Sequence, residues 1–189
     1  MPLHIPDPPS DVPAKVTTKL HEFADGAKFS TKALHGARAD QLDLSTPHQV
    51  FTVGLDAITS GAGLAAAQPV GWRFLVMNNG QLVASAETTQ APDGTNEASQ
   101  FTEGPFVDAT DKALHDLRKL PQLEAAGFEL RLLRIPALYV MALWLHAPTT
   151  DLLVPLAPSP FKKEGKLLPP AEFFADLSEL AADAAAPPA

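Results

Sequence analysis

Three apolar segments that follow one another closely are the feature that most constrains the fold of this chain. They are Phe128–Arg134, Leu138–His146 and Leu152–Leu156, and only Pro136 and Pro148-Thr149-Thr150 interrupt them. Short apolar segments bounded by turn residues are typical of buried strands. Because the connections are so short, neighbouring segments should pair in antiparallel fashion. This part of the chain therefore predicts the buried centre of a β-sheet.

A β-hairpin is predicted upstream of this region. Trp72–Met77 and Leu82–Thr88 are largely apolar and flank the sequence Asn78-Asn79-Gly80. Asn and Gly accept the positive φ angles that tight hairpin turns require. The two segments therefore predict a second antiparallel pair of strands.

Apolar residues recur at helical spacing in four further regions, which we predict to be helices. These regions are residues 12–25, 46–58, 106–120 and 169–181. In the second region, Thr46 is placed to cap the helix and Pro47 suits its first position. Residues 90–104 show no strand pattern and are predicted to form the largest internal loop.

Together these elements predict a single domain of the α+β class. Their order along the chain (α-β-β-α-β-β-β-α) implies a five-stranded, mainly antiparallel sheet with helices packed mainly on one face. We expect an extended Pro-rich arm at residues 1–11, the domain at 12–181 and a disordered tail at 182–189. The order resembles that of the roadblock and longin-like interaction modules, which carry a helix between the second and third strands of a five-stranded sheet.

Composition and charge argue against several classes of function. The 189 residues include 14 Lys and Arg against 22 Asp and Glu, a formal charge of −8 that would repel nucleic acid. The longest apolar run, Ile135 to Leu145, is well short of the roughly 20 residues that span a membrane. Without Cys, the chain has no disulfide, thiolate metal ligand or Cys nucleophile. The N-terminus resembles no export signal, so we expect a cytoplasmic protein, with no metal or cofactor.

Two sequence patterns suggest chemistry but have simpler structural explanations. Gly61-Ala62-Gly63-Leu64-Ala65-Ala66 matches a dinucleotide-binding pattern, but it follows a predicted helix where that pattern requires a strand. Asp108, Asp111 and His115 would share one helical face, as metal ligands or acid–base groups would. Acidic residues near a helix start also stabilise the helix dipole, and an Asp and a His four residues apart form an ordinary surface pair. We therefore interpret both patterns as structural.

Polar residues within the apolar strands are stronger candidates for a binding site. A three-residue hairpin turn would place Arg73 opposite Glu87 as an ion pair, whereas a two-residue turn at Asn79-Gly80 would place them on opposite faces. His146 lies at a strand end on the same face as Trp144, where it could line a pocket or make a structural hydrogen bond. The candidate binding residues are therefore Arg73, Glu87, Trp144 and His146, and no catalytic residue is assigned.

Other residues are candidates for an interface with a second protein. Trp72 could anchor a partner, because large aromatic side chains concentrate binding energy at interfaces, although such residues are more often part of a core. Phe173 and Phe174 are neighbours in a helix, so both cannot point fully inward. Arg131 and Arg134 cannot point to the same face of a regular strand, so one of them should face solvent or a partner.

The sequence shows no assembled catalytic or metal-binding set, so we expect a non-enzymatic protein-interaction module. It would act as an adaptor, a chaperone-like protein or a homo-oligomer, and would bind a protein partner or itself. The alternative is a small-ligand-binding protein or enzyme with a pocket between the sheet and the loop at 90–104. In that case Arg73, Glu87 or His146 would contact the ligand.

Overall fold

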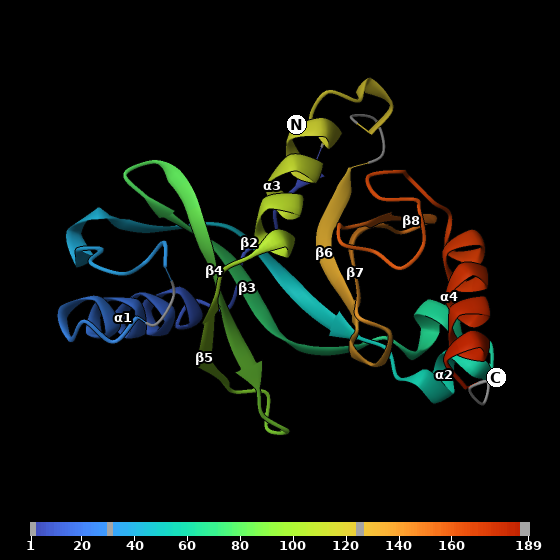
Figure 1. Ribbon diagram of the computed structural model, residues 1–189, viewed down its shortest axis with the longest axis horizontal. Coiled ribbons are helices and arrows are strands. Elements are labelled where there is room, and N and C mark those ends of the chain that lie inside the picture. Colours follow the sequence, from blue (N-terminus) through green and yellow to red (C-terminus); the bar gives the residue numbers. More distant parts are fainter. Residues whose placement is uncertain (1–2, 30–31, 124–126, 186–189) are drawn as a thin grey trace.

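The computed structural model describes residues 3–29, 32–123 and 127–185, which fold around one mixed β-sheet (Figure 1). The strands are β1 (Leu3–His4), β2 (Leu42–Thr52), β3 (Gln68–Asn78), β4 (Gln81–Gln90), β5 (Asn96–Thr102), β6 (Phe128–Ile135), β7 (Val140–Ala147) and β8 (Thr150–Pro155). The helices are α1 (Val12–Asp25), α2 (Leu55–Thr59), α3 (Pro105–Leu117) and α4 (Pro170–Ala185). The eight-stranded sheet has the order β5-β4-β3-β2-β6-β7-β8, and β1 also pairs with β6.

Two parallel pairings make the sheet mixed. β1 and β2 both run parallel to β6, whereas the other neighbouring strands are antiparallel. The predicted five-stranded, mainly antiparallel sheet is therefore wrong, although the α+β class is confirmed. The resemblance to roadblock and longin-like modules depended on that five-strand order and is not supported.

Strand β2 occupies most of the region in which the sequence predicts a helix at 46–58. Val50 and Phe51 point to opposite faces of a central strand, and each packs into a different core. A strand that is buried on both faces loses the alternation of polar and apolar residues by which strands are recognised. Thr46 has a φ of 46° and lies within an irregularity of the β2–β3 pairing, so it does not cap a helix. A helix begins only at Leu55, as the short α2.

Strand β5 lies inside the region predicted to be a loop at 90–104. It forms one edge of the sheet and pairs only with β4. Its Glu97, Ser99 and Gln100 are exposed, so the strand lacks the apolar pattern used to recognise strands. Polar and charged residues on an edge strand protect it against pairing with other chains. The loop prediction failed because an edge strand contributes little to the core.

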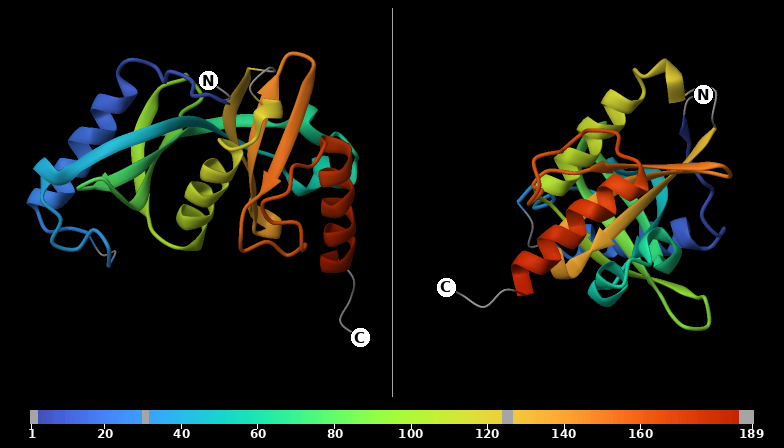
Figure 2. Two further views of the ribbon diagram at one scale, coloured as in Figure 1. Left: turned by 90° about the horizontal axis from the view of Figure 1, so that it is seen from above. Right: turned by 90° about the vertical axis from the view of Figure 1, so that its right-hand side faces the viewer.

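Helices cover both faces of the sheet, and not mainly one face as predicted. Leu75 of β3 and Leu132 of β6 belong to the core beneath α3, whereas their neighbours Phe74 and Leu133 point to the opposite face. On that opposite face, α1 packs over the half of the sheet near β5, and α2 and α4 pack over the half near β8. Figures 1 and 2 show α1 and α4 toward opposite ends of the sheet, with α3 between them.

Several individual elements agree with the sequence prediction. The β3–β4 hairpin, the strands β6 to β8, and the helices α1 and α3 lie within a few residues of their expected positions. In the region predicted as an arm, Leu3 and His4 pair with Phe128 and Glu129. Helix α4 continues through residues 182–185 of the region predicted as a tail, and residues 186–189 lie outside the described part of the chain. Among the described helices, none has the length and apolar character that a membrane crossing requires.

Candidate functional site

A β-bulge in the hairpin decides how two of the candidate residues are placed. The turn is of the two-residue type, with Asn79 and Gly80 at its tip. A register shift just beyond the turn leaves Val83 of β4 without a partner in β3. This extra residue restores the pairing of Arg73 with Glu87, which a regular two-residue hairpin would have placed on opposite faces. The two side chains therefore meet on the face of the sheet that α3 covers.

Arg73 and Glu87 belong to a buried ion cluster beneath α3. The Glu87 carboxylate accepts contacts from two arginines, with Arg73 Nε at 3.5 Å and Arg134 Nη2 at 2.9 Å. Arg73 Nη1 also donates a 3.0 Å hydrogen bond to Thr110 Oγ1 of α3. The side chains of Arg73 and Glu87 are only 2% and 5% exposed. The cluster therefore fixes α3 to the sheet but presents little surface to a ligand.

His48 lies next to this cluster and stays neutral. It is fully buried on β2, directly opposite Arg73. Burial, together with the charges of Arg73 and Arg134, lowers the pKa of His48 to about 3, and the hydrogen bond to the Thr46 carbonyl oxygen opposes this effect only in part. Burial also lowers the pKa of Arg73 to about 10, despite the attraction of Glu87. At neutral pH the cluster therefore contains two cations, one carboxylate and a neutral imidazole.

Trp144 and His146 form a separate cluster on the opposite face of the sheet. Asp151 Oδ1 accepts a 2.7 Å hydrogen bond from Trp144 Nε1 and lies 2.8 Å from His146 Nδ1. The Arg131 guanidinium lies 4.8 Å from the centre of the Trp144 ring, and its Nε donates a 2.7 Å hydrogen bond to Glu129. The four candidate binding residues therefore fall into two pairs on opposite faces, and they do not line one common pocket.

The chemistry available to the Trp144 cluster is limited by its own contacts. A carboxylate that is hydrogen-bonded to Nδ1 of His146 would orient the imidazole ring, as it does when a histidine acts as a general base or a metal ligand. The same Asp151 oxygen is shared with Trp144, however, and Glu129 is engaged by Arg131. Within residues 3–29, 32–123 and 127–185, no three His, Asp or Glu side chains are grouped so that they could hold a metal ion. The arrangement is that of a structural hydrogen-bond network.

The three candidate interface residues differ in exposure. Trp72 and Phe173 are 7% and 0% exposed, and they pack in the cores beneath α1 and α4 respectively. Phe174 is half-buried beside Phe173, with ring centres 5.5 Å apart. Tyr139, in contrast, is 85% exposed at the turn between β6 and β7, where its φ of 54° is unusual for an aromatic residue. Trp72 and Phe173 are thus held within the core of this chain.

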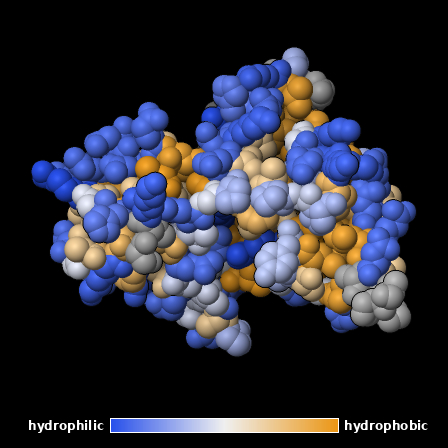
Figure 3. Space-filling view, in the orientation of Figure 1, coloured by the Kyte–Doolittle hydropathy of each residue, from blue (hydrophilic) through white to orange (hydrophobic). Residues whose placement is uncertain are grey.

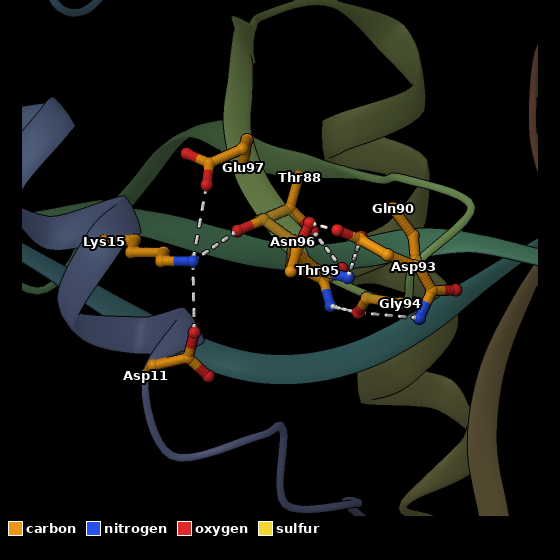
Figure 4. Close-up of polar contacts among 9 residues, drawn as sticks. All are labelled: Asp11, Lys15, Thr88, Gln90, Asp93, Gly94, Thr95, Asn96 and Glu97. Carbon is orange, nitrogen blue, oxygen red and sulfur yellow. Dashed lines mark hydrogen bonds and ion pairs between the residues drawn. The ribbon is translucent and has the colours of Figure 1, made fainter.

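The region around residues 90–104 contains a polar network and a small hollow. Lys15 of α1 donates to the Asn96 carbonyl oxygen at 3.0 Å and forms ion pairs with Asp11 and Glu97 at 3.1 and 3.4 Å (Figure 4). These contacts join α1 to β5. A hollow of about 390 Å³ lies at the turn between β4 and β5, lined by Gln68, Pro69, Gln90, Ala91, Pro92 and Gly94. None of the candidate residues Arg73, Glu87 and His146 lines this hollow.

A groove along α3 is the feature that sequence reasoning missed. We define the α3 groove as the hollow of about 450 Å³ between one side of α3 and the connection that joins β8 to α4. It is lined by Pro105, Asp108, Ala109, Lys112, Ala113, Asp116, Leu117, Leu120, Pro155, Leu156, Ala157, Glu164 and Gly165. Figure 3 shows mainly hydrophilic residues on the outer side of α3 and paler to orange surface beside it. The only hint in the sequence is the pair Ala109 and Ala113, two small residues one turn apart on a helix.

Both walls of the groove are fixed to the rest of the fold. Arg73 holds α3 through Thr110, as described above. The connection is held by Lys163, whose Nζ lies 2.9 Å from Glu172 Oε1 and 2.8 Å from Asp176 Oδ2, both on α4. Two backbone hydrogen bonds of 2.8 Å between residues 153 and 168 secure the C-terminal part of the connection. Both walls of the groove are therefore held in place by contacts within this chain.

A larger hollow, of about 610 Å³, lies between the end of α1 and residues 35–40. Its charged side chains include Arg38 and Asp40, which pair with each other at 2.9 Å. These two side chains are both well exposed, so their pairing contributes little. This hollow lacks the buried leucines that line the α3 groove, and we regard the α3 groove as the better candidate site.

Comparison with known proteins gives no further guidance, because no family model, no curated protein and no solved structure matches the chain.

Proposed function

We propose that the chain is a non-enzymatic protein-interaction module that binds an extended segment of a partner protein in the α3 groove. The observation that carries this proposal is the form of the groove. Its floor contains the buried Leu117 and Leu156, and its rim carries exposed charged side chains such as Asp108 and Glu164. An apolar floor with a charged rim is the usual form of a protein-binding groove.

The length of the groove favours a peptide segment as the occupant. The residues of α3 that line the groove extend from Pro105 to Leu117, which is the whole length of this 13-residue helix. At a rise of 1.5 Å per residue, this wall is about 20 Å long. An extended chain advances about 3.3 Å per residue, so the groove would accept a segment of about six residues.

The fixed walls support the same proposal. A groove that must form during binding loses affinity to the entropy of ordering its walls. Here Thr110 and Lys163 tie the two walls to the sheet and to α4 before binding. A short segment can therefore bind with useful affinity although it buries little area.

Blocking the groove with a large side chain tests the proposal. A library of short random peptides would be selected against the wild-type chain and against Ala109→Trp, in which an indole fills the groove. We expect the wild-type chain to enrich peptides that bind Ala109→Trp at least about tenfold more weakly, because the indole occupies their site. Binding would be measured by titration with the synthetic peptides.

The matched control is Ala182→Trp, which places the same side chain at an exposed position of α4 away from the groove. It should bind the selected peptides as the wild-type chain does. Ala157→Trp, on the facing wall, provides a second block if Ala109→Trp disturbs folding. If no selected peptide distinguishes either blocked variant from the control, the proposed function is wrong.

A further inference from the structure

Small residues line the α3 groove on both walls. Ala109 and Ala113 contribute from α3, and Ala157 and Gly165 contribute from the connection. Ala113 is buried, whereas Ala157 and Gly165 are exposed at the side of the hollow. With the buried Leu117 and Leu156 at its floor, the hollow of about 450 Å³ offers an apolar site for a large side chain.

The charged side chains that line the groove are mainly acidic. Three of them are carboxylates, Asp108, Asp116 and Glu164, and Lys112 is the only cation that lines the described part of the groove. Asp116 also lies 3.3 Å from Lys119, but both side chains are more than half exposed, so this pair is weak. The rim therefore carries a net negative charge.

The cations on the connection do not line the groove. Lys163 is engaged by two carboxylates of α4. Lys162 and Lys166 are exposed on the same connection but do not line the groove. A partner segment in the groove would therefore lie among more carboxylates than ammonium groups.

From these two observations we infer that the segment bound in the α3 groove is an apolar and basic peptide. A large apolar side chain, such as Leu, Phe or Trp, fills the hollow between Ala109 and Gly165. Lys or Arg residues beside it lie near Asp116 and Glu164. This inference rests on the proposed function, to which it adds the chemistry of the partner. Charge complementarity of this kind sets specificity and association rate more than total affinity.

The charge of the selected peptides tests the inference. Peptides from the random library that lose binding to Ala109→Trp should combine large apolar residues with Lys or Arg. The double variant Asp116→Lys/Glu164→Lys should bind such a basic peptide about tenfold more weakly than the wild-type chain at physiological salt. Glu179→Lys/Asp183→Lys is the matched control, since it makes the same change in net charge at exposed positions of α4.

The outcomes separate this inference from the proposed function. Selected peptides that are acidic or uncharged, but still lose binding to Ala109→Trp, would overturn the inference and leave the groove as a peptide site. The same holds if the two double variants bind a basic peptide equally well. Assembly of the chain into a dimer that Ala109→Trp disrupts would identify a second copy as the occupant and also overturn the inference. A lack of any groove-dependent peptide would contradict the proposed function itself.

Discussion

Replacing Glu87 with Gln should lower the free energy of unfolding by about 3 to 5 kcal/mol, because the substitution leaves the buried cation Arg73 and the partly exposed Arg134 without their carboxylate. Glu87 compensates both Arg73 and Arg134, at 3.5 and 2.9 Å. Gln has nearly the same shape, so the loss would come from charge and not from a cavity. The measurement is urea denaturation followed by circular dichroism, compared with the wild-type chain.

Two further variants show whether the charge cluster is responsible. Glu97→Gln removes a carboxylate that is 74% exposed and paired with Lys15, and it should change stability by less than about 0.5 kcal/mol. Arg73→Met should lower the free energy of unfolding by less in the Glu87→Gln background than in the wild-type chain. In that background the Arg73 guanidinium has already lost the carboxylate of Glu87. A loss below about 1 kcal/mol for Glu87→Gln would show that the cluster does not hold α3 in place.

Phe173→Ala should lower the free energy of unfolding by about 3 to 5 kcal/mol, the range found when a buried aromatic side chain is replaced by Ala. Phe173 is fully buried in the core beneath α4, and its ring centre lies 5.7 Å from that of Phe161. The substitution removes these contacts and leaves a cavity between α4 and the sheet. Thermal and chemical unfolding would both report the loss.

The neighbouring Phe174 provides the matched control. It is half-buried, so Phe174→Ala should cost about 1 to 2 kcal/mol, from the partial loss of apolar burial. The two substitutions are chemically identical, and Ala favours the helix equally at both positions. If Phe174→Ala proved the more destabilising of the two, the orientation of α4 described above would be incorrect.

Regions of the fold with a simple burial pattern could be predicted from the sequence. Strands β6 to β8 and the β3–β4 hairpin were recognisable because short apolar segments are bounded there by Pro, Asn and Gly. Strand β2 could not be recognised, because Val50 and Phe51 pack into cores on opposite faces of the sheet and their order along the chain resembles a helical pattern. Strand β5 could not be recognised either, because an exposed edge strand needs no apolar pattern. Strand β1 was also missed, because its two residues lie in the Pro-rich region predicted as an arm. These three omissions explain why the sequence alone led to five strands and not eight.

The candidate site was harder to predict than the fold. Arg73 and Glu87 were recognised as a possible pair, but their meeting depends on a bulge at Val83 that no sequence signal marks. The α3 groove joins residues of α3 to residues about fifty positions later in the chain, and its lining includes Ala109, Ala113, Ala157 and Gly165. Ala and Gly carry no chemical signature of binding, so only the tertiary arrangement reveals the hollow.

The most direct test of the proposed function is photo-crosslinking from the rim of the groove in cells of the organism that makes the chain. A photoreactive residue at Lys112, which is exposed and lines the groove, would report the occupant, and the same residue at Glu179 on α4 is the control. We expect a discrete adduct from position 112 that is absent from position 179 and is lost when Ala109→Trp is added. Mass spectrometry should place the crosslink in a short apolar and basic segment of another protein. The absence of an adduct at position 112, or an adduct that Ala109→Trp leaves unchanged, would contradict the proposal that the α3 groove binds a protein partner.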